Sequence, residues 1–149
     1  MELTSTWWFW ALLSAVFAAL TAIFAKVGVK QIDSDVATFV RTVVILVTLG
    51  LILLALGKFH SPGEVGTRTW VFLVLSGLAT GASWICYFRA LKLGDASLVA
   101  PVDKLSVVLV AVFGVTLLGE RLSLLQWGGV ALVGAGAVLL VVKIGRAHV

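Results

Sequence analysis

The chain alternates between long apolar stretches and short polar connections. Five apolar stretches fill most of the sequence, and they cover residues 7–29, 36–57, 70–91, 97–118 and 124–142. A helix that rises about 1.5 Å per residue needs about 20 apolar residues to cross a hydrocarbon core about 30 Å thick. The pattern therefore predicts an all-α membrane protein, a bundle of five transmembrane helices.

The connections between these stretches are too short to form separate domains. The longest, residues 58–69, contains Pro62, Gly63 and Gly66 and is typical of a polar turn. Short connections place consecutive helices side by side in antiparallel order. We therefore expect one five-helix transmembrane domain over residues 1–149.

The composition and the charge of the chain exclude several classes of protein. Hydrophobic residues make up 61% of the chain and charged residues 12%, whereas soluble domains have about half and about a quarter. The lone Cys86 excludes an internal disulfide, and His60 and His148 lie in hydrophilic segments without metal-ligand neighbours. We expect no metal and no cofactor, and nothing in the sequence resembles an enzyme site.

The basic residues predict membrane orientation. The chain has a net charge of +4, and its basic residues are scattered over the span ends, so we expect a lipid-bilayer partner and no nucleic acid. Lys58, Arg68 and Arg121 lie on the side of the N-terminus. The opposite side carries Lys26, Lys30, Arg89, Lys92, Lys143 and Arg146. The positive-inside rule then places the N-terminus outside and the C-terminus in the cytoplasm.

Inside the predicted spans we single out four ionisable residues as candidates: Lys26, Arg41, Asp103 and Lys104. A charge near the centre of a membrane helix costs at least about 2.5 kcal/mol, so it reaches the interface, pairs with another group or lines a hydrated cavity. Lys26 is close enough to the end of its span to reach the interface. Because alternate spans run in opposite directions, all four residues fall in the cytoplasmic half of the bundle.

Asp103 is the group least able to reach water, because its side chain is short. It is either a structural partner of Arg41 or a lysine, or it changes its protonation or charge partner during a transport cycle. The second alternative makes Asp103 the candidate proton-coupling residue. Pro101 cannot donate to the carbonyl of Ser97, so we expect a kink and a candidate hinge there.

Polar and aromatic residues follow helical spacing at this depth. Thr80, Trp84 and Tyr87 have i, i+4, i+7 spacing on the third span. Together with Thr21, Arg41 and Lys104 they form the predicted substrate-binding set. Arg41 or Lys104 would attract an anionic group, and Trp84 and Tyr87 would stack on an apolar or cationic one.

Small residues on the last span predict close helix contact. Such residues let membrane helices approach each other when lipid removes the hydrophobic drive for association. The contact is either packing within the chain or a subunit interface. For the interface we single out Gly128, Gly129, Gly134 and Gly136.

Several motifs resemble the EamA type of the drug/metabolite transporter superfamily, specifically its short five-span members. They are YFRALKLGDAS (residues 87–97), VAPVDKLS (99–106), LGERLS (118–123) and the QWGG and GAG segments of the last span. The first span and ATFVRTVVIL (37–46) also fit. The first span has no carboxylate, whereas the small multidrug transporters carry an essential glutamate there.

The resemblance implies a small-molecule carrier in a prokaryotic cytoplasmic membrane. Ten-span relatives contain two such units in opposite orientation, which implies that a five-span chain pairs with a second unit, most simply as an inverted homodimer. The bias in Lys and Arg favours a single orientation, so a parallel dimer or a related partner chain stays open. We expect a dimeric carrier that works by alternating access. The alternatives are a subunit of a lipid-linked sugar flippase and a non-transporting accessory protein.

Overall fold

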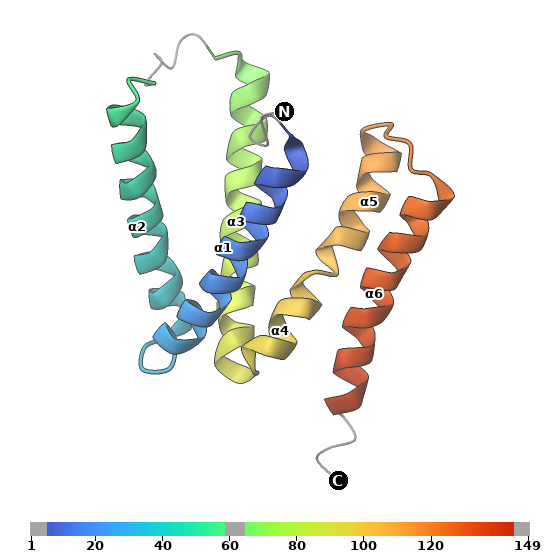
Figure 1. Ribbon diagram of the computed structural model, residues 1–149. Helices are drawn as coiled ribbons and strands as arrows, with labels where there is room; N and C mark the ends of the chain where they lie inside the picture. The colour runs from blue at the N-terminus through green and yellow to red at the C-terminus, as the bar shows by residue number, and fades with distance from the viewer. Residues whose placement is uncertain (1–5, 59–64, 145–149) are drawn as a thin grey trace. The chain divides into compact units, whose positions relative to one another are not determined.

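The computed structural model describes residues 6–58 and 65–144, and these residues form helices and no strand (Figure 1). The helices are α1 (Trp7–Gly28), α2 (Ser34–Ala55), α3 (Thr67–Leu93), α4 (Ala96–Asp103), α5 (Ser106–Leu117) and α6 (Leu124–Ile144). α4 and α5 together form one apolar segment, Ala96–Leu117, so that 5 segments are long and apolar enough to cross a membrane. The predicted all-α fold with five membrane spans is confirmed, and the chain is a multi-pass membrane protein.

The chain divides into two compact units, Met1–Leu93 and Gly94–Val149. The N-terminal unit contains α1, α2 and α3, and the C-terminal unit contains α4, α5 and α6. The single domain expected over residues 1–149 stays a prediction.

In the N-terminal unit, α1 and α2 each pack against α3. Most of the buried apolar side chains lie where the end of α1, the start of α2 and the end of α3 meet. They are Ala22, Ala25, Val29, Ala37, Phe88 and Leu91. The small alanines allow the helix backbones to approach closely. Asp33 caps α2, because its Oδ1 accepts a hydrogen bond of 2.8 Å from the backbone N–H of Asp35.

In the C-terminal unit, α6 packs against both α4 and α5. Trp127, Val130, Gly134 and Ala137 form its inner face, at the spacing of a helical stripe. The turn before α6 is held by a reciprocal capping box. The backbone N–H of Ser123 donates to Oε1 of Gln126 at 2.7 Å, and the N–H of Gln126 donates to Oγ of Ser123 at 3.3 Å.

The fourth span is interrupted in its middle. α4 ends at Asp103, and α5 begins at Ser106. Around the break the backbone changes to i→i−3 hydrogen bonds: the N–H of Leu105 donates to the carbonyl of Val102, and that of Val107 to the carbonyl of Lys104, both at 3.0 Å. Pro101 lies inside α4, two residues before its end, and has no N–H to donate. The interruption therefore lies one turn or less beyond the proline.

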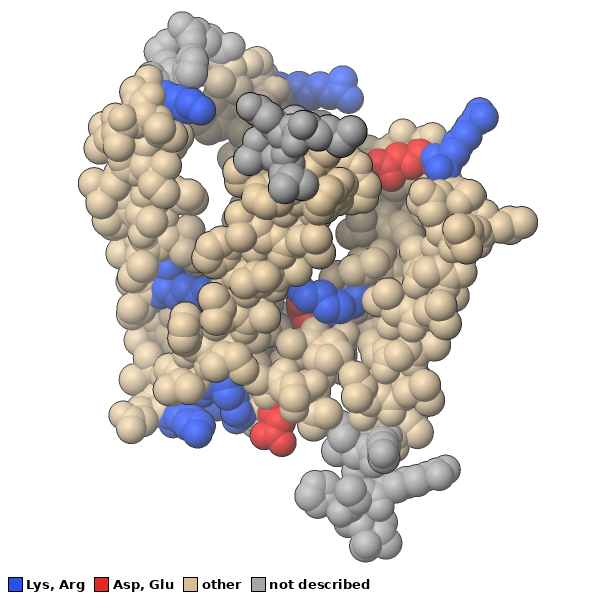
Figure 2. Space-filling model, viewed as in Figure 1, with Lys and Arg blue, Asp and Glu red and all other residues tan. Residues whose placement is uncertain are grey.

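Most large apolar side chains point outward. Trp7, Leu46, Leu117 and Leu132, for example, are each more than two-thirds exposed. Figure 2 shows a mostly tan surface, with basic and acidic side chains mainly toward the helix ends and some basic atoms at mid-height. In a membrane protein this outward apolar surface faces lipid or another subunit, since the bilayer core accepts apolar side chains as readily as a protein core does.

Candidate functional site

Arg41 lies against aromatic rings in the N-terminal unit. It comes seven residues after the first residue of α2, about 10 Å along the helix axis. Its Cζ lies 4.0 Å from the ring centroid of Trp84 and 5.6 Å from that of Phe88. Trp84 and Phe88 are four residues apart on α3, so they occupy neighbouring turns of one helix face. Contacts of this kind stabilise a guanidinium by about 0.5–2 kcal/mol.

The guanidinium of Arg41 has no carboxylate or carbonyl partner within the described part of the N-terminal unit. The ion pair in this unit joins Arg89 to Asp35 instead. A guanidinium carries five N–H donors, and aromatic faces satisfy its charge without accepting hydrogen bonds in its plane. Arg41 is therefore left with donors that a ligand or water would satisfy.

A cavity of about 350 Å³ adjoins Arg41. From α1 and the residues after it, the cavity is lined by Thr21, Phe24, Ala25, Gly28, Val29 and Ile32. α2 contributes Ala37, Val40 and Arg41, and α3 contributes Phe88. The walls are mostly apolar with few polar groups, which is the usual composition of a small-molecule site.

Thr21 brings a second polar group to this cavity. Five other threonines, Thr38, Thr42, Thr48, Thr80 and Thr116, each donate their hydroxyl to the carbonyl four residues earlier at 2.8 Å. Within the described residues, the Thr21 hydroxyl makes no such bond. The cavity thus contains a guanidinium and a hydroxyl that both have donors to offer.

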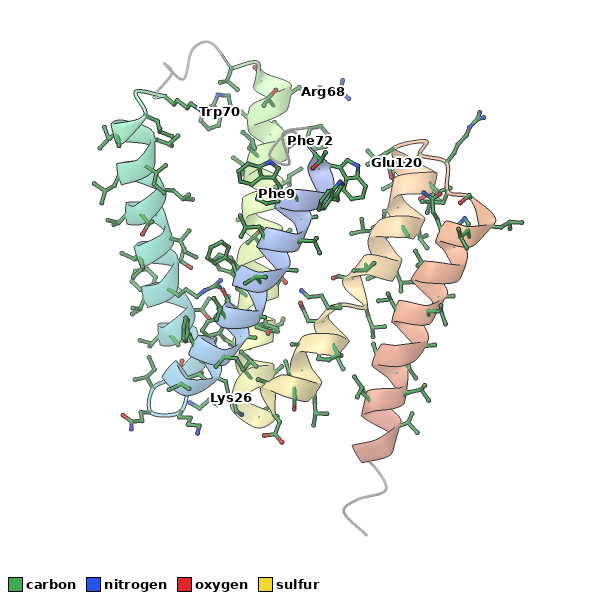
Figure 3. All side chains as sticks on the ribbon, in the orientation of Figure 1. Phe9, Lys26, Arg68, Trp70, Phe72 and Glu120 are labelled. Atoms are coloured by element: carbon green, nitrogen blue, oxygen red, sulfur yellow. The ribbon has the colours of Figure 1, made fainter. Side chains whose placement is uncertain are left out.

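Three polar contacts join α1, α2 and α3 at the end of the N-terminal unit where α1 connects to α2. Arg89 binds Asp35 through two hydrogen bonds, Nε to Oδ1 at 3.1 Å and a terminal nitrogen to Oδ2 at 2.6 Å. Nζ of Lys92 donates to the carbonyl of Ile32 at 2.9 Å, and Nζ of Lys26 donates to the carbonyl of Leu91 at 2.7 Å. Figure 3 shows Lys26 at this end of α1 and Arg68 at the opposite end of α3. The Lys92 contact holds the loop residue Ile32, which lines the cavity.

In the C-terminal unit, Asp103 pairs with its neighbour Lys104. Nζ of Lys104 lies 3.2 Å from Oδ2 of Asp103, and both side chains are partly exposed. Asp103 is the last residue of α4, and Lys104 is the residue that follows it. The pair therefore lies directly at the break in the fourth span, with the cation at a helix C-terminus, where the helix dipole favours it.

The glycines of α6 differ in their surroundings. A Cβ built on Gly134 would lie 3.2 Å from Cγ2 of Val108 on α5, whereas Cβ atoms on Gly128, Gly129 and Gly136 would have nothing within 4 Å. Gly134 thus serves packing within the unit. Gly129 and Gly136 are seven residues apart, within about 20° of each other around the helix, and are free to contact another surface.

The structure brings together some residues of the predicted substrate-binding set. Thr21 and Arg41 line one cavity, and Trp84 supports Arg41 from α3. Thr80 is exposed, with its hydroxyl bonded to its own helix, and the cavity lining does not include Thr80 or Tyr87. Lys104 and Asp103 belong to the other unit, and their part in the site stays a prediction.

Sequence reasoning missed Phe88 and the Arg89–Asp35 pair. Phe88 could have been found, because it lies four residues after Trp84 and seven after Gly81, on the same face of the helix. The described residues contain no group of three His, Cys, Asp or Glu side chains that could hold a metal ion. His60 and His148 lie outside the described residues.

Comparison with known proteins adds two relatives and a family. The chain is 64% identical over 140 residues to an uncharacterized transporter in the cobO 3' region of Sinorhizobium sp., covering 94% of this chain and 99% of the relative. It is 27% identical over 143 residues to the uncharacterized transporter YxxF of Bacillus subtilis (strain 168), and this match spans 94% of the chain but only 44% of that relative. No solved structure matches the chain. Residues 5–142 match the EamA-like transporter family, and the chain belongs to that family.

Proposed function

We propose that the chain is a small-molecule transporter that works as a dimer by alternating access between two five-span units. The observation that carries the proposal is the cavity of about 350 Å³ among α1, α2 and α3, with Arg41 at its wall. A cationic side chain within a membrane span is costly unless it has a function or a partner. In a family of transporters, such a group beside a cavity is best understood as a substrate contact.

The lengths of the two relatives support a dimer. The match to the Bacillus subtilis transporter covers 44% of that protein, so more than one further unit of this size fits in the rest of it. The Sinorhizobium relative is covered to 99% and has room for one unit only. If transport needs two units, as inverted-repeat carriers do, a relative of single-unit length such as the Sinorhizobium protein would obtain its second unit by association, and we propose the same arrangement for this chain.

Two features of the C-terminal unit suit a moving part. The fourth span is interrupted directly after Pro101 and Asp103, and discontinuous membrane helices commonly surround transported substrates and coupling ions. In this proposal Pro101 is the hinge, Asp103 is the proton-coupling residue, and Lys104 is its partner in the present state. All three residues lie within one turn of the break between α4 and α5.

We place the protein in the cytoplasmic membrane of a prokaryote, with the N-terminus outside. The distribution of Lys and Arg at the span ends supports this orientation. Because the charge bias favours one orientation, it fits a parallel homodimer or a pair with a related chain, whereas an inverted homodimer requires a bias weak enough for dual insertion.

The test begins with the purified protein in detergent and a chemically diverse panel of small metabolites. A compound that binds the folded state raises its unfolding temperature by mass action. The compound that stabilises most is then used, radiolabelled, for counterflow into proteoliposomes. We expect saturable counterflow that requires a dimer. A stabilising compound that shows no counterflow would contradict the proposal and favour a non-transporting accessory protein.

A further inference from the structure

One face of Trp84 is already covered by the protein, and Trp84 does not line the cavity. Arg41 lies over this ring at 4.0 Å and near Phe88 at 5.6 Å. A cationic ligand at the same place would have to displace the guanidinium or lie beside a like charge. Trp84 is therefore a positioning residue for Arg41, not an aromatic face for a cationic substrate.

Arg41 and Thr21 offer hydrogen-bond donors to the same cavity. Neither side chain has an acceptor within the described part of the N-terminal unit, and both line the cavity. Among the lining residues there is no Asp or Glu. A ligand ammonium would find no carboxylate there, whereas a ligand carboxylate would find a guanidinium and a hydroxyl.

The remaining walls set the size and polarity of the occupant. Phe24 and Phe88 supply aromatic surface, and Val29, Ile32 and Val40 supply aliphatic surface. A volume of about 350 Å³ lies at the lower end of the range for ligand pockets, which is roughly 300–1,000 Å³. The occupant is therefore small and apolar apart from its charged group.

We propose that this cavity binds a small organic monoanion, whose carboxylate pairs with Arg41 and accepts from Thr21, and whose apolar body lies against Phe24 and Phe88. The proposal rests on the transport function proposed above and names the substrate class of the same cavity. Arg suits this role better than Lys would, because its planar fork can bind both carboxylate oxygens while its face stays on the aromatic rings.

The test compares three probes of nearly equal shape: phenylpropionate, phenylpropionamide and phenylpropylamine. Binding to the full-length protein in detergent is measured by thermal unfolding and by isothermal titration. Charge-assisted hydrogen bonds are stronger than neutral ones, and we expect them to favour a carboxylate over its amide by about tenfold or more. We expect phenylpropionate to bind most tightly and phenylpropylamine not to bind.

Arg41→Gln is the critical variant, and Arg68→Gln is its matched control. Arg68 also lies over a phenylalanine ring, 6.0 Å from the centroid of Phe72, but it does not line the cavity. We expect Arg41→Gln to abolish the preference for carboxylate over amide, and Arg68→Gln to keep it. Arg41→Lys should keep part of the affinity for phenylpropionate, which confirms a folded protein.

Several results would overturn the proposal. Tighter binding of the amide or the amine, or binding of none of the three probes, would exclude a monoanion of this size. Stabilisation by phosphatidylglycerol but not by phenylpropionate, lost in Arg41→Gln, would assign the anion to a lipid headgroup. An equal loss of ligand-free stability in Arg41→Gln and Asp103→Asn, without a ligand response, would make Arg41 an internal partner. The proposed transport function has a separate test. It is contradicted if a compound found in the metabolite screen binds to the protein but gives no counterflow.

Discussion

Arg89 and Asp35 form a two-point ion pair that joins the last turns of α3 to the first turn of α2. The two hydrogen bonds measure 3.1 and 2.6 Å, and roughly half of each side chain is exposed. Fork-to-fork geometry makes such a pair stronger than an ordinary surface salt bridge, while exposure and salt weaken it. Asp35 comes three residues after Ile32, which lines the cavity.

We expect Asp35→Asn and Arg89→Gln each to lower the unfolding temperature of the purified protein, and we expect high salt to lower it in the wild type as well. The reason is that each substitution removes the charge that holds the start of α2 against α3. A double-mutant cycle with both substitutions should show coupling between the two residues. Additive effects would mean that the pair contributes nothing to stability.

Trp84→Leu should weaken phenylpropionate binding by about 2- to 30-fold, the equivalent of a cation–π contact of about 0.5–2 kcal/mol. Removal of the ring leaves Arg41 free to turn away from the cavity. Trp84→Phe keeps an aromatic face and should recover most of the affinity. The measurement is isothermal titration. A similar loss in both variants would show that Trp84 contributes only bulk to the unit.

Asp103→Asn distinguishes proton coupling from structural pairing. If Asp103 carries the coupling proton, the variant should lose proton-driven accumulation but keep substrate exchange, because the amide cannot release or bind a proton in this range. If it only pairs with Lys104, the variant should mainly lose stability. Flux with and without a pH gradient, together with thermal unfolding, separates the two. Normal proton-driven flux would end the coupling hypothesis.

Gly136→Leu should convert a dimer to a monomer in detergent without unfolding it. A Cβ at position 136 would have nothing within 4 Å, so we expect a leucine there to act mainly on a contact with another surface. Gly134→Leu should instead destabilise the C-terminal unit, because its side chain would collide with Val108. Gly50→Leu on α2, which also has open space, is the matched control. Light scattering gives the mass, and a dimer that survives Gly136→Leu would place the interface elsewhere.

Reporter fusions should place Val149 in the cytoplasm. The expectation follows from the excess of Lys and Arg on the side of the C-terminus. Cysteine labelling from outside the cell, after removal of the native Cys86, gives an independent measurement. Equal labelling of both termini from outside would show dual insertion and would favour the inverted homodimer over the parallel one.

The five spans were predictable because a run of about 20 apolar residues matches the thickness of the bilayer and is rare in soluble domains. The rotation of each helix was not predictable. In a soluble helix the polar face shows which side points to water. Here nearly every helix face is apolar, and an apolar face suits contact with lipid as well as contact with another helix. Thr80 was therefore placed with Trp84 in the predicted site, whereas the structure exposes Thr80 and buries Phe88.

The depth of Arg41 was readable from the sequence, but its surroundings were not. Its place within a span follows from counting residues, and so the cationic group of the candidate site was identified. Contacts such as Arg89 with Asp35 join residues 54 positions apart, and they depend on how neighbouring helices are turned and shifted. Rules based on the spacing of residues within one helix cannot predict contacts between residues so far apart in the sequence.

The break in the fourth span also has a consequence for hydration. Pro101 cannot supply the N–H that the carbonyl of Ser97 would receive in a regular helix, and hydrocarbon offers no substitute donor. Ser97 is the second residue of the span Ala96–Leu117, so water or a lipid headgroup at the membrane surface can donate to this carbonyl. The missing donor thus holds the start of α4 at the level of the headgroups, because deeper insertion would leave the main chain at Ser97 without a hydrogen-bond partner.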